Sequence, residues 1–159
     1  HGDVLTVRAC TVLAVSLLAC AVTLGVPATS RAASCTVTAT RVNFGNYNPL
    51  NAAPLNRTGR IIVRCSGAGT VTVALSTGQS GSYNPRYMLS GATGDQLDYN
   101  LYTNAARNII WGDGTGGTLT SSQLFNNNRV RLNVYARVPA RQDIAPGNYI
   151  DNITATISF

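Results

Sequence analysis

Apolar and polar side chains alternate strictly along residues 129–138, whose sequence is RVRLNVYARV. A period of two residues places successive side chains on opposite faces of an extended chain, as in a β-strand with one buried face. The inward positions are Val130, Leu132, Val134, Ala136 and Val138, and the outward ones include Arg129, Arg131, Tyr135 and Arg137. This run predicts a strand that spans a sheet, with its apolar face toward the core.

Shorter runs of the same kind recur along the chain, so the sequence predicts an all-β domain. Turn residues separate the runs about every ten positions, and no helical stretch lies between them, which favours a sandwich over a parallel sheet. We expect an Ig-like Greek-key β-sandwich of about seven to eight short strands. The expected strands are residues 35–44, 57–65, 70–76, 86–90, 97–103, 108–111, 129–138 and 149–159.

The segments between these strands are expected to be turns and loops. Residues 97–103 and 108–111 are expected to pair as a hairpin, and residues 45–56, 77–85 and 112–128 to form exposed loops. The alternation in the first strand slips near Arg41 and Val42, which predicts a bulge.

The last run, residues 149–159, ends on an aromatic residue without a closing turn. Five of its apolar residues fall on one face of the expected strand, namely Tyr149, Ile153, Ala155, Ile157 and Phe159. An edge strand with an uncovered apolar face is an aggregation hazard unless another element covers it. The sequence therefore raises the question of what pairs with this strand.

The first 32 residues differ from the rest of the chain. Residues 9–30 carry no charge, and small residues precede a cleavage point after Ala32. This pattern predicts a secretory signal peptide at residues 1–32 and an exported domain at residues 33–159. An uncleaved membrane anchor and a lipoprotein site at residues 17–20 are the alternatives.

Two cysteines, Cys35 and Cys65, remain in the expected mature domain. In an exported chain a pair of cysteines favours a disulfide over a metal site, and two separate buried thiols are the alternative. A bridge that closes a loop of this length would contribute roughly 3–4 kcal/mol in the chain-entropy model.

Groups that could perform catalysis are scarce. The chain has twelve Arg without Lys, six Asp without Glu, and its single His is His1. A Ser or Cys nucleophile needs a nearby base, usually His, so we expect neither an enzyme nor a cofactor. A small hydrolytic or carbohydrate-binding domain is the alternative, with Asp95, Asp98 and Asp113 as its candidate carboxylates.

The glycine-rich stretch WGDGTGGT, residues 111–118, has the composition of an anion- or cation-binding loop. A phosphate loop needs a Lys and a following helix, and the stretch offers neither. Asp113 is its only carboxylate, whereas calcium needs several oxygen ligands. We expect an ordinary loop and no metal site, with calcium at Asp113 as the alternative.

Arg129, Arg131 and Arg137, with Tyr135 between them, form a basic stripe on the outward face of one expected strand. Such a stripe can attract anionic surface polymers, and a solvated strand face is the alternative. Nucleic acid is not an expected partner, because an exported protein rarely meets it.

Five segments together resemble the spore coat protein U domain family, which includes the pilins of archaic chaperone–usher fimbriae. They are VNFGNYN (42–48), GQSGSYNPRYM (78–88), LDYNLYTN (97–104), IIWGDGTGG (109–117) and PGNYIDNITATISF (146–159). The resemblance covers residues 34–159, and the order of the five segments makes it specific.

The resemblance implies an incomplete Ig-like sandwich that lacks its last strand. Its partners would be a periplasmic chaperone, an outer-membrane usher and neighbouring subunits that donate a strand. Cys35 and Cys65 match the cysteine pair that joins the first two strands of the family. The implied groove residues are Val37, Ile153 and Ile157, and the implied chaperone contacts are Ile157 and Phe159.

The function implied is a secreted structural or adhesive subunit of a chaperone–usher fimbria, exported through the periplasm to the cell surface. The alternative is a spore-coat or envelope surface protein that acts outside a fibre. Cleavage after Ala32 would leave two residues before Cys35, too few for a donor strand. A subunit that accepts a strand without donating one is expected at the tip of the fibre.

Overall fold

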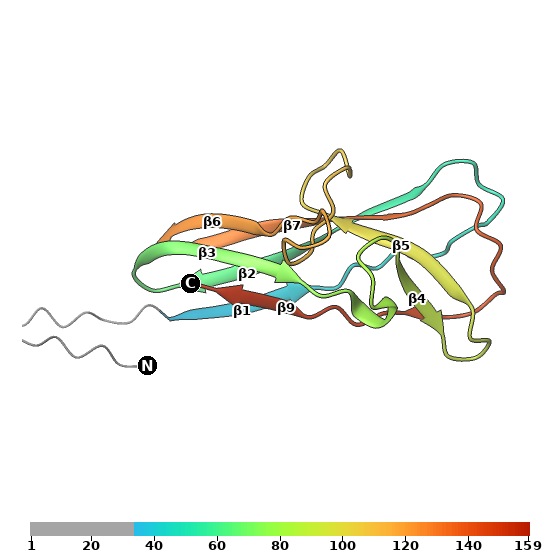
Figure 1. Cartoon of the computed structure of the whole chain (residues 1–159), viewed down its shortest axis with the longest axis horizontal. Coiled ribbons are helices and arrows are strands. Elements are labelled where there is room, and N and C mark those ends of the chain that lie inside the picture. Colours follow the sequence, from blue (N-terminus) through green and yellow to red (C-terminus); the bar gives the residue numbers. More distant parts are fainter. Residues whose placement is uncertain (1–33) are drawn as a thin grey trace, which may run out of the picture. The chain divides into compact units, whose positions relative to one another are not determined.

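The computed structural model describes residues 34–159 (Figure 1). The signal peptide expected at residues 1–32 and both alternatives to it lie outside the described residues. Among residues 34–159, no helix is long and apolar enough to cross a membrane.

The described chain consists of nine strands and one short 3-10 turn, η1 (Gly78–Ser80). The strands are β1 (Cys35–Thr40), β2 (Leu55–Cys65), β3 (Ala68–Leu75), β4 (Arg86–Ser90), β5 (Gln96–Tyr102), β6 (Ser121–Asn126), β7 (Arg129–Val138), β8 (Tyr149–Ile150) and β9 (Ala155–Ser158).

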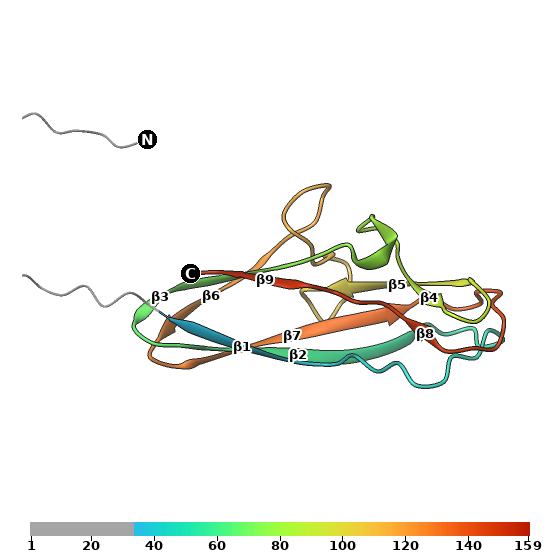
Figure 2. The same ribbon diagram turned by 90° about the horizontal axis from the view of Figure 1, so that it is seen from below.

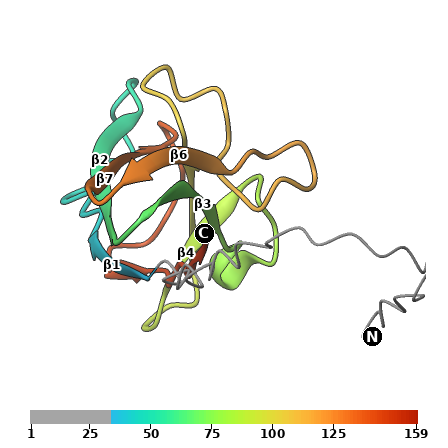
Figure 3. The ribbon, with the colours of Figure 1, turned by 90° about the vertical axis from the view of Figure 1, so that its left-hand side faces the viewer.

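The strands form two sheets, and every pairing between named strands is antiparallel. One sheet has the order β1-β2-β7-β5-β4-β8 and the other β6-β3-β9. Figures 1 and 3 show the smaller sheet lying against the larger one. The fold is therefore an Ig-like β-sandwich, and the predicted fold class is confirmed.

The core contains the inward positions that the alternating runs predict. All five apolar positions of β7 are buried, as are Ile61 and Val63 of β2 and Val71, Val73 and Leu75 of β3. Trp111 is also fully buried, and its indole Nε1 donates to the backbone oxygen of Val73 at 2.9 Å. Alternation thus correctly identified which side chains face the interior.

The predicted loop at residues 112–128 is wrong in its second half, because it contains β6. Residues 121–126, SSQLFN, pair with β3 from Val73↔Ser121 to Ala68↔Asn126. Phe125 is the one residue of β6 that is buried. A strand that buries a single side chain has no alternating apolar signal, so the sequence pattern could not reveal it.

The predicted bulge near Arg41 and Val42 is also wrong, since β1 ends at Thr40 and irregular chain follows. This segment crosses β2 closely at Gly59. A Cβ atom at Gly59 would lie 2.6 Å from Val42 Cγ2 and 3.2 Å from the backbone oxygen of Thr40. The glycine gives the chain room to leave the sheet at this point.

The predicted hairpin between residues 97–103 and 108–111 is present in a reduced form. Tyr102 and Ile110 make an isolated bridge, and the Trp111 nitrogen donates to the Leu101 oxygen at 2.9 Å. The regular partners of β5 are instead β4 and β7.

The final run is divided between the two sheets, which corrects the prediction of one strand at residues 149–159. β8 pairs with β4 in the larger sheet, whereas β9 pairs with β3 in the smaller one. Asp151 holds the crossing between them, because its Oδ1 accepts hydrogen bonds from the Gln79 and Asn152 nitrogens at 2.9 and 2.7 Å.

Candidate functional site

Two edge strands, β1 and β9, border an open side of the sandwich. β1 is the last strand of the larger sheet and pairs only with β2, while β9 is the last strand of the smaller sheet and pairs only with β3. Figures 1 and 2 show the two strands along the same border of the domain. Within residues 34–159, each of the two strands therefore has one edge whose backbone groups have no neighbouring strand.

The inward face of β1 is exposed although its partners on β2 are buried. Val37 lies opposite Val63 and Ala39 lies opposite Ile61 in the β1–β2 register. Val63 and Ile61 belong to the core, yet Val37 and Ala39 are exposed. Paired residues share one face of a sheet, so a covering element is missing over this part of the interior.

A groove with a volume of about 1110 Å³ opens between the two edges. One wall is residues 39–47, which run from the end of β1 into the following loop, and the other is residues 144–153 together with Ala155. The floor consists of core side chains from five strands, namely Ile61, Leu75, Met88, Leu97, Leu101 and Val134. The groove thus reaches down to side chains of the hydrophobic core.

The hydroxyl of Tyr99 is a polar group within the mainly apolar lining of the groove. Its hydroxyl donates to Asp151 Oδ2 at 2.6 Å, and both residues line the groove. Burial raises the pKa of the Tyr99 hydroxyl well above its usual value, and the hydrogen bond to Asp151 raises it further. Tyr99 is therefore a neutral hydrogen-bond donor that fixes the 144–155 wall to β5.

Arg86 is a fully buried cation in β4, and sequence reasoning missed it. Its Nε and Nη2 donate to the Ser76 oxygen at 3.0 and 2.8 Å, and Nη2 also donates to the Trp111 oxygen at 2.7 Å. Nη1 donates to Asn100 Oδ1 at 2.8 Å. Burial lowers the pKa of the Arg86 guanidinium.

These bonds connect β4 and β5 to Ser76, which follows β3, and to Trp111, which precedes the loop at residues 112–120. The sequence did contain a signal for this role of Arg86. It occupies the same face of its short strand as Met88 and Ser90, and all three are buried. A charged residue at an inward position of a strand indicates a hydrogen-bonded interior site.

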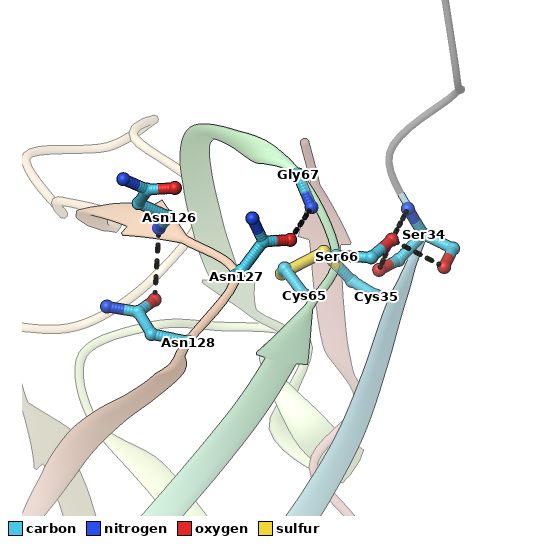
Figure 4. Close-up of a disulfide and its surroundings, with 8 residues drawn as sticks. All are labelled: Ser34, Cys35, Cys65, Ser66, Gly67, Asn126, Asn127 and Asn128. Carbon is cyan, nitrogen blue, oxygen red and sulfur yellow. Dashed lines mark hydrogen bonds between the residues drawn. A yellow bond between two sulfur atoms is a disulfide. The ribbon is translucent and has the colours of Figure 1, made fainter.

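The predicted disulfide between Cys35 and Cys65 is confirmed, with an S–S distance of 2.06 Å (Figure 4). The two cysteines are direct partners in the β1–β2 register. Next to them the Ser66 nitrogen donates to the Ser34 oxygen at 2.9 Å, and the Ser34 nitrogen donates to Ser66 Oγ at 3.2 Å. The first edge strand is thus anchored covalently where it enters the sheet.

The adjacent turn between β6 and β7 is hydrogen-bonded to the same end of the sandwich. The Gly67 nitrogen donates to Asn127 Oδ1, and the Asn127 nitrogen donates to the Gly67 oxygen, both at 2.6 Å (Figure 4). This end of the domain is therefore closed by hydrogen bonds and a disulfide, whereas the border between β1 and β9 is open.

The residues that the family resemblance assigned to the groove and the chaperone lie in different environments. Ile153 lines the groove, and Val37 is exposed on the inward face of β1 outside the measured cavity. Ile157 lies in β9 opposite Val73 and packs against the core. Phe159 follows β9 and is 58% exposed.

The arginine stripe lies on the outer face of the larger sheet. Arg129 and Arg131 are exposed, whereas Tyr135 and Arg137 are half-buried. Arg137 Nε donates to Asn56 Oδ1 at 2.9 Å, and the Arg107 guanidinium lies 5.6 Å from the centre of the Tyr135 ring. The stripe and the groove therefore use opposite faces of the strands.

Asp113, the candidate calcium ligand, is engaged within its own loop. Its Oδ1 accepts hydrogen bonds from the Thr115 nitrogen at 2.9 Å and from Thr115 Oγ1 at 2.7 Å, and these bonds lower the pKa of the carboxyl. Within residues 34–159, no group of three or more His, Cys, Asp or Glu residues is positioned to hold a metal ion.

Comparison with known proteins identifies a family and a curated relative. The profile of the Spore Coat Protein U domain matches residues 20–156 of this chain. The curated protein named Protein U, from Myxococcus xanthus, is 33% identical over 129 residues, which make up 74% of this chain and 71% of that protein.

A similar fold occurs in the CsuC–CsuE chaperone–tip adhesion subunit pre-assembly complex from the archaic chaperone–usher Csu pili of Acinetobacter baumannii. A chain of that complex is 25% identical to this one, with a TM-score of 0.56 and 80% of this chain covered. The present chain spans only 40% of the length of that protein.

Proposed function

The chain belongs to the Spore Coat Protein U domain family, and we propose that it is a surface-fibre subunit that accepts a strand from another protein. The strand would lie in the groove between β1 and β9. Family membership and the likeness to proteins of archaic chaperone–usher pili support a fimbrial subunit. That this subunit accepts a strand goes beyond what these similarities support, and it is argued from the groove.

The observation that carries this proposal is the apolar groove beside two strand edges that are unpaired within residues 34–159, together with the exposure of Val37 and Ala39 on the inward face of β1. An extended segment placed there could form main-chain hydrogen bonds with both edges and insert alternate side chains into the apolar floor. This is strand addition, of which donor-strand complementation between chaperones and pilins is an established example. Four or five inserted apolar side chains would contribute on the order of 10 kcal/mol, as an upper bound.

The partners follow from the same proposal. A periplasmic chaperone would fill the groove first, an outer-membrane usher would receive the complex, and a neighbouring subunit would then replace the chaperone strand. The chaperone is supported by the solved neighbour, which comes from a complex of a chaperone with a tip adhesion subunit. Ile157 and Phe159 would contact the chaperone, because β9 forms one border of the open side.

Export is part of the proposal as well. Residues 1–32 would be the signal peptide, and residues 33–159 the domain that passes through the periplasm to the cell surface. The role would be structural or adhesive rather than enzymatic, in keeping with the pilus family.

The position in the fibre is a separate proposal, and we place this subunit at the tip. It is supported by the likeness to a chain from a complex that contains a tip adhesion subunit. Amino-terminal sequencing of the exported protein tests the placement. A mature protein with a segment of about ten residues or more before Cys35 could donate a strand, and this would argue for a shaft position.

The alternative is a coat or envelope protein that acts outside a fibre, which the description of the family as a spore coat domain favours. Immunogold electron microscopy of intact cells separates the two. Label along thin fibres supports the fimbrial role, whereas label spread over a coat or envelope without fibres supports the alternative.

The groove itself can be tested with two substitutions on neighbouring residues of β9. Ala155 lines the groove, whereas Thr156 is exposed on the opposite face of the same strand. Each residue is changed to Arg in the full chain, which is expressed together with its chaperone. Recovery of the complex from the periplasm is then measured by affinity capture of the chaperone.

We expect Ala155→Arg to reduce recovery at least tenfold, because a charged side chain would occupy the apolar groove without a partner. Thr156→Arg should leave recovery within about twofold, since surface substitutions rarely exceed ±0.5 kcal/mol. Equal recovery of both variants would contradict strand acceptance in this groove.

A further inference from the structure

The outer face of β2 and β7 gathers exposed arginines that come from two separate segments of the sequence. Arg64 lies directly opposite Arg129 in the β2–β7 register, Arg131 lies opposite Ile62, and Arg60 lies opposite Asn133. Arg60, Arg64, Arg129 and Arg131 are all exposed, and we call these four residues the arginine face. Only half of this face was visible in the sequence, because Arg60 and Arg64 join it through strand pairing.

Acidic residues do not balance these charges on the strands that carry them. The sequences of β1, β2 and β7 contain neither Asp nor Glu. Like charges directly opposite each other in a sheet are destabilising. The pairing of Arg64 with Arg129 therefore has an energetic cost within the domain, and an anionic partner would remove that cost.

The neighbouring strand adds hydroxyl groups to the same face. Thr36 lies opposite Arg64, and Thr40 lies opposite Arg60, with Thr38 between them opposite Ile62. All three threonines are exposed on the edge strand β1. Directly opposed residues in a sheet are about 5 Å apart, and every second residue along a strand is about 7 Å further on. The face thus offers guanidinium and hydroxyl groups in neighbouring rows on adjacent strands.

Two further arginines extend the positive charge along β7. Arg137 and Tyr135 lie on the same side as Arg131, and Arg107 lies over the Tyr135 ring at 5.6 Å from its centre. Arg107 is held there by Nε, which donates to the Ala136 oxygen at 3.2 Å. The charge therefore follows the strand direction instead of forming one compact site, and this shape suits a linear ligand.

We propose that the arginine face binds a linear anionic polysaccharide. Guanidinium groups pair with carboxylate, sulfate or phosphate oxygens in a two-pronged geometry, and the threonine hydroxyls can bond to sugar hydroxyls between the anionic groups. The choice of a polysaccharide over a nucleic acid rests on the surface location given under the proposed function. The face lies on the outside of the sheet, so a strand in the groove would leave it uncovered.

The test measures binding of the full chain, recovered with its chaperone, to four immobilised polymers of similar size. These are a polyuronate, a sulfated glycosaminoglycan, uncharged dextran and duplex DNA. The test variant is Arg129→Gln/Arg131→Gln. The control is Arg57→Gln/Arg141→Gln, which removes the same net charge from two exposed arginines outside the face. Thermal melting of each variant verifies that the domain is folded.

The expected result is binding to one or both anionic polysaccharides but not to dextran. The test variant should lose affinity at least tenfold. The slope of the logarithm of the binding constant against the logarithm of the salt concentration should also fall by about one for each lost contact. The control should change less than twofold. The polyuronate and the glycosaminoglycan distinguish a carboxylate ligand from a sulfate ligand.

Three outcomes would overturn the proposal. Equal losses in the test variant and the control would mean that net charge alone attracts the polymer. Tighter binding to DNA than to either polysaccharide would identify a nucleic-acid surface, and equal binding to dextran would show that charge is not recognised. Because groove binding is read from chaperone recovery, failure of the arginine face is distinguishable from failure of strand acceptance.

Discussion

Val37 in β1 lies directly opposite Val63 in β2, yet Val63 is fully buried while Val37 is 46% exposed. The two side chains have the same size and point toward the same side of the sheet. Their difference arises because β7 lies beside β2, whereas no described strand lies on the free side of β1. This pair of valines gives a direct way to measure what the missing neighbour would contribute.

The effects of truncating the two valines should therefore respond differently to a bound strand: the cost at Val63 should not depend on the strand, whereas the cost at Val37 should. Val63→Ala should cost about 2 kcal/mol of unfolding free energy in either state, because it leaves a cavity in the core. Val37→Ala should cost less than about 0.5 kcal/mol in the free domain and more with the groove filled. Denaturant unfolding of the free domain and the chaperone complex measures both. Equal effects of Val37→Ala in the two states would contradict a strand at this position.

Removal of the disulfide should weaken the edge that borders the groove. The change Cys35→Ser/Cys65→Ser opens a loop of 30 residues and should cost about 3–4 kcal/mol by the chain-entropy model. Hydrogen exchange should accelerate first in β1, which has one neighbouring strand. A variant with unchanged exchange in β1 would show that the backbone pairs with β2 suffice to hold it.

Arg86→Met should destabilise the domain although it retains an unbranched apolar side chain at this buried position. The change leaves the backbone oxygens of Ser76 and Trp111 without their guanidinium donors, and each buried unpaired acceptor costs about 1–3 kcal/mol. We expect a total loss of about 3 kcal/mol or more in the unfolding free energy. Arg57→Met, at an exposed position, should change stability by less than about 0.5 kcal/mol.

Tyr99 should make the stability of the domain sensitive to alkaline pH. Its pKa is raised in the folded state, so the protonated hydroxyl favours folding. This contribution is complete below the unfolded pKa of about 10 and declines as the pH rises above that value.

The comparison of wild type with Tyr99→Phe isolates this effect from the other tyrosines. At pH 7 the variant should lose about 1 kcal/mol, because Asp151 Oδ2 loses its hydrogen bond from the hydroxyl. Above pH 10 the difference between the two proteins should shrink. A difference that stays constant from pH 7 to pH 11 would contradict the raised pKa.

Phe159→Ser tests the proposed chaperone contact without disturbing the domain. Phe159 is 58% exposed and follows the end of β9, so its loss should change stability by less than about 0.5 kcal/mol. Recovery of the chaperone complex from the periplasm should nevertheless fall several-fold. The change Ile157→Ser is less informative, because Ile157 also packs against the core. Unchanged recovery of Phe159→Ser would remove Phe159 from the contact.

Much of the fold could be predicted from local patterns. A period of two residues specifies which side chains of a strand share a face, and the buried positions of β2, β3, β5 and β7 agree with it. The two cysteines of the expected exported domain were sufficient to anticipate the Cys35–Cys65 bond. Five short segments in order were sufficient to identify the family.

Features that depend on contacts between distant segments could not be predicted from local patterns. β6 escaped detection because its pairing with β3 buries only Phe125. The alternation of the final run is interrupted at Ile150 and Asp151, but this interruption does not reveal that the two halves belong to different sheets. Alternation records whether a residue faces the core, and it carries no information about which sheet or neighbour the strand joins.

The sequence by itself determined the inward and outward faces and the disulfide pair, because these follow from local spacing and composition, and the family followed from the resemblance of five segments. The tertiary structure alone decided that β1 and β9 both end at one open border, that Arg86 lies inside, and that Arg64 faces Arg129. The groove and the arginine face both arise from the pairing of strands far apart in the chain. Such pairing is set by the packing of the whole core, so the periodicity of a single strand cannot specify it.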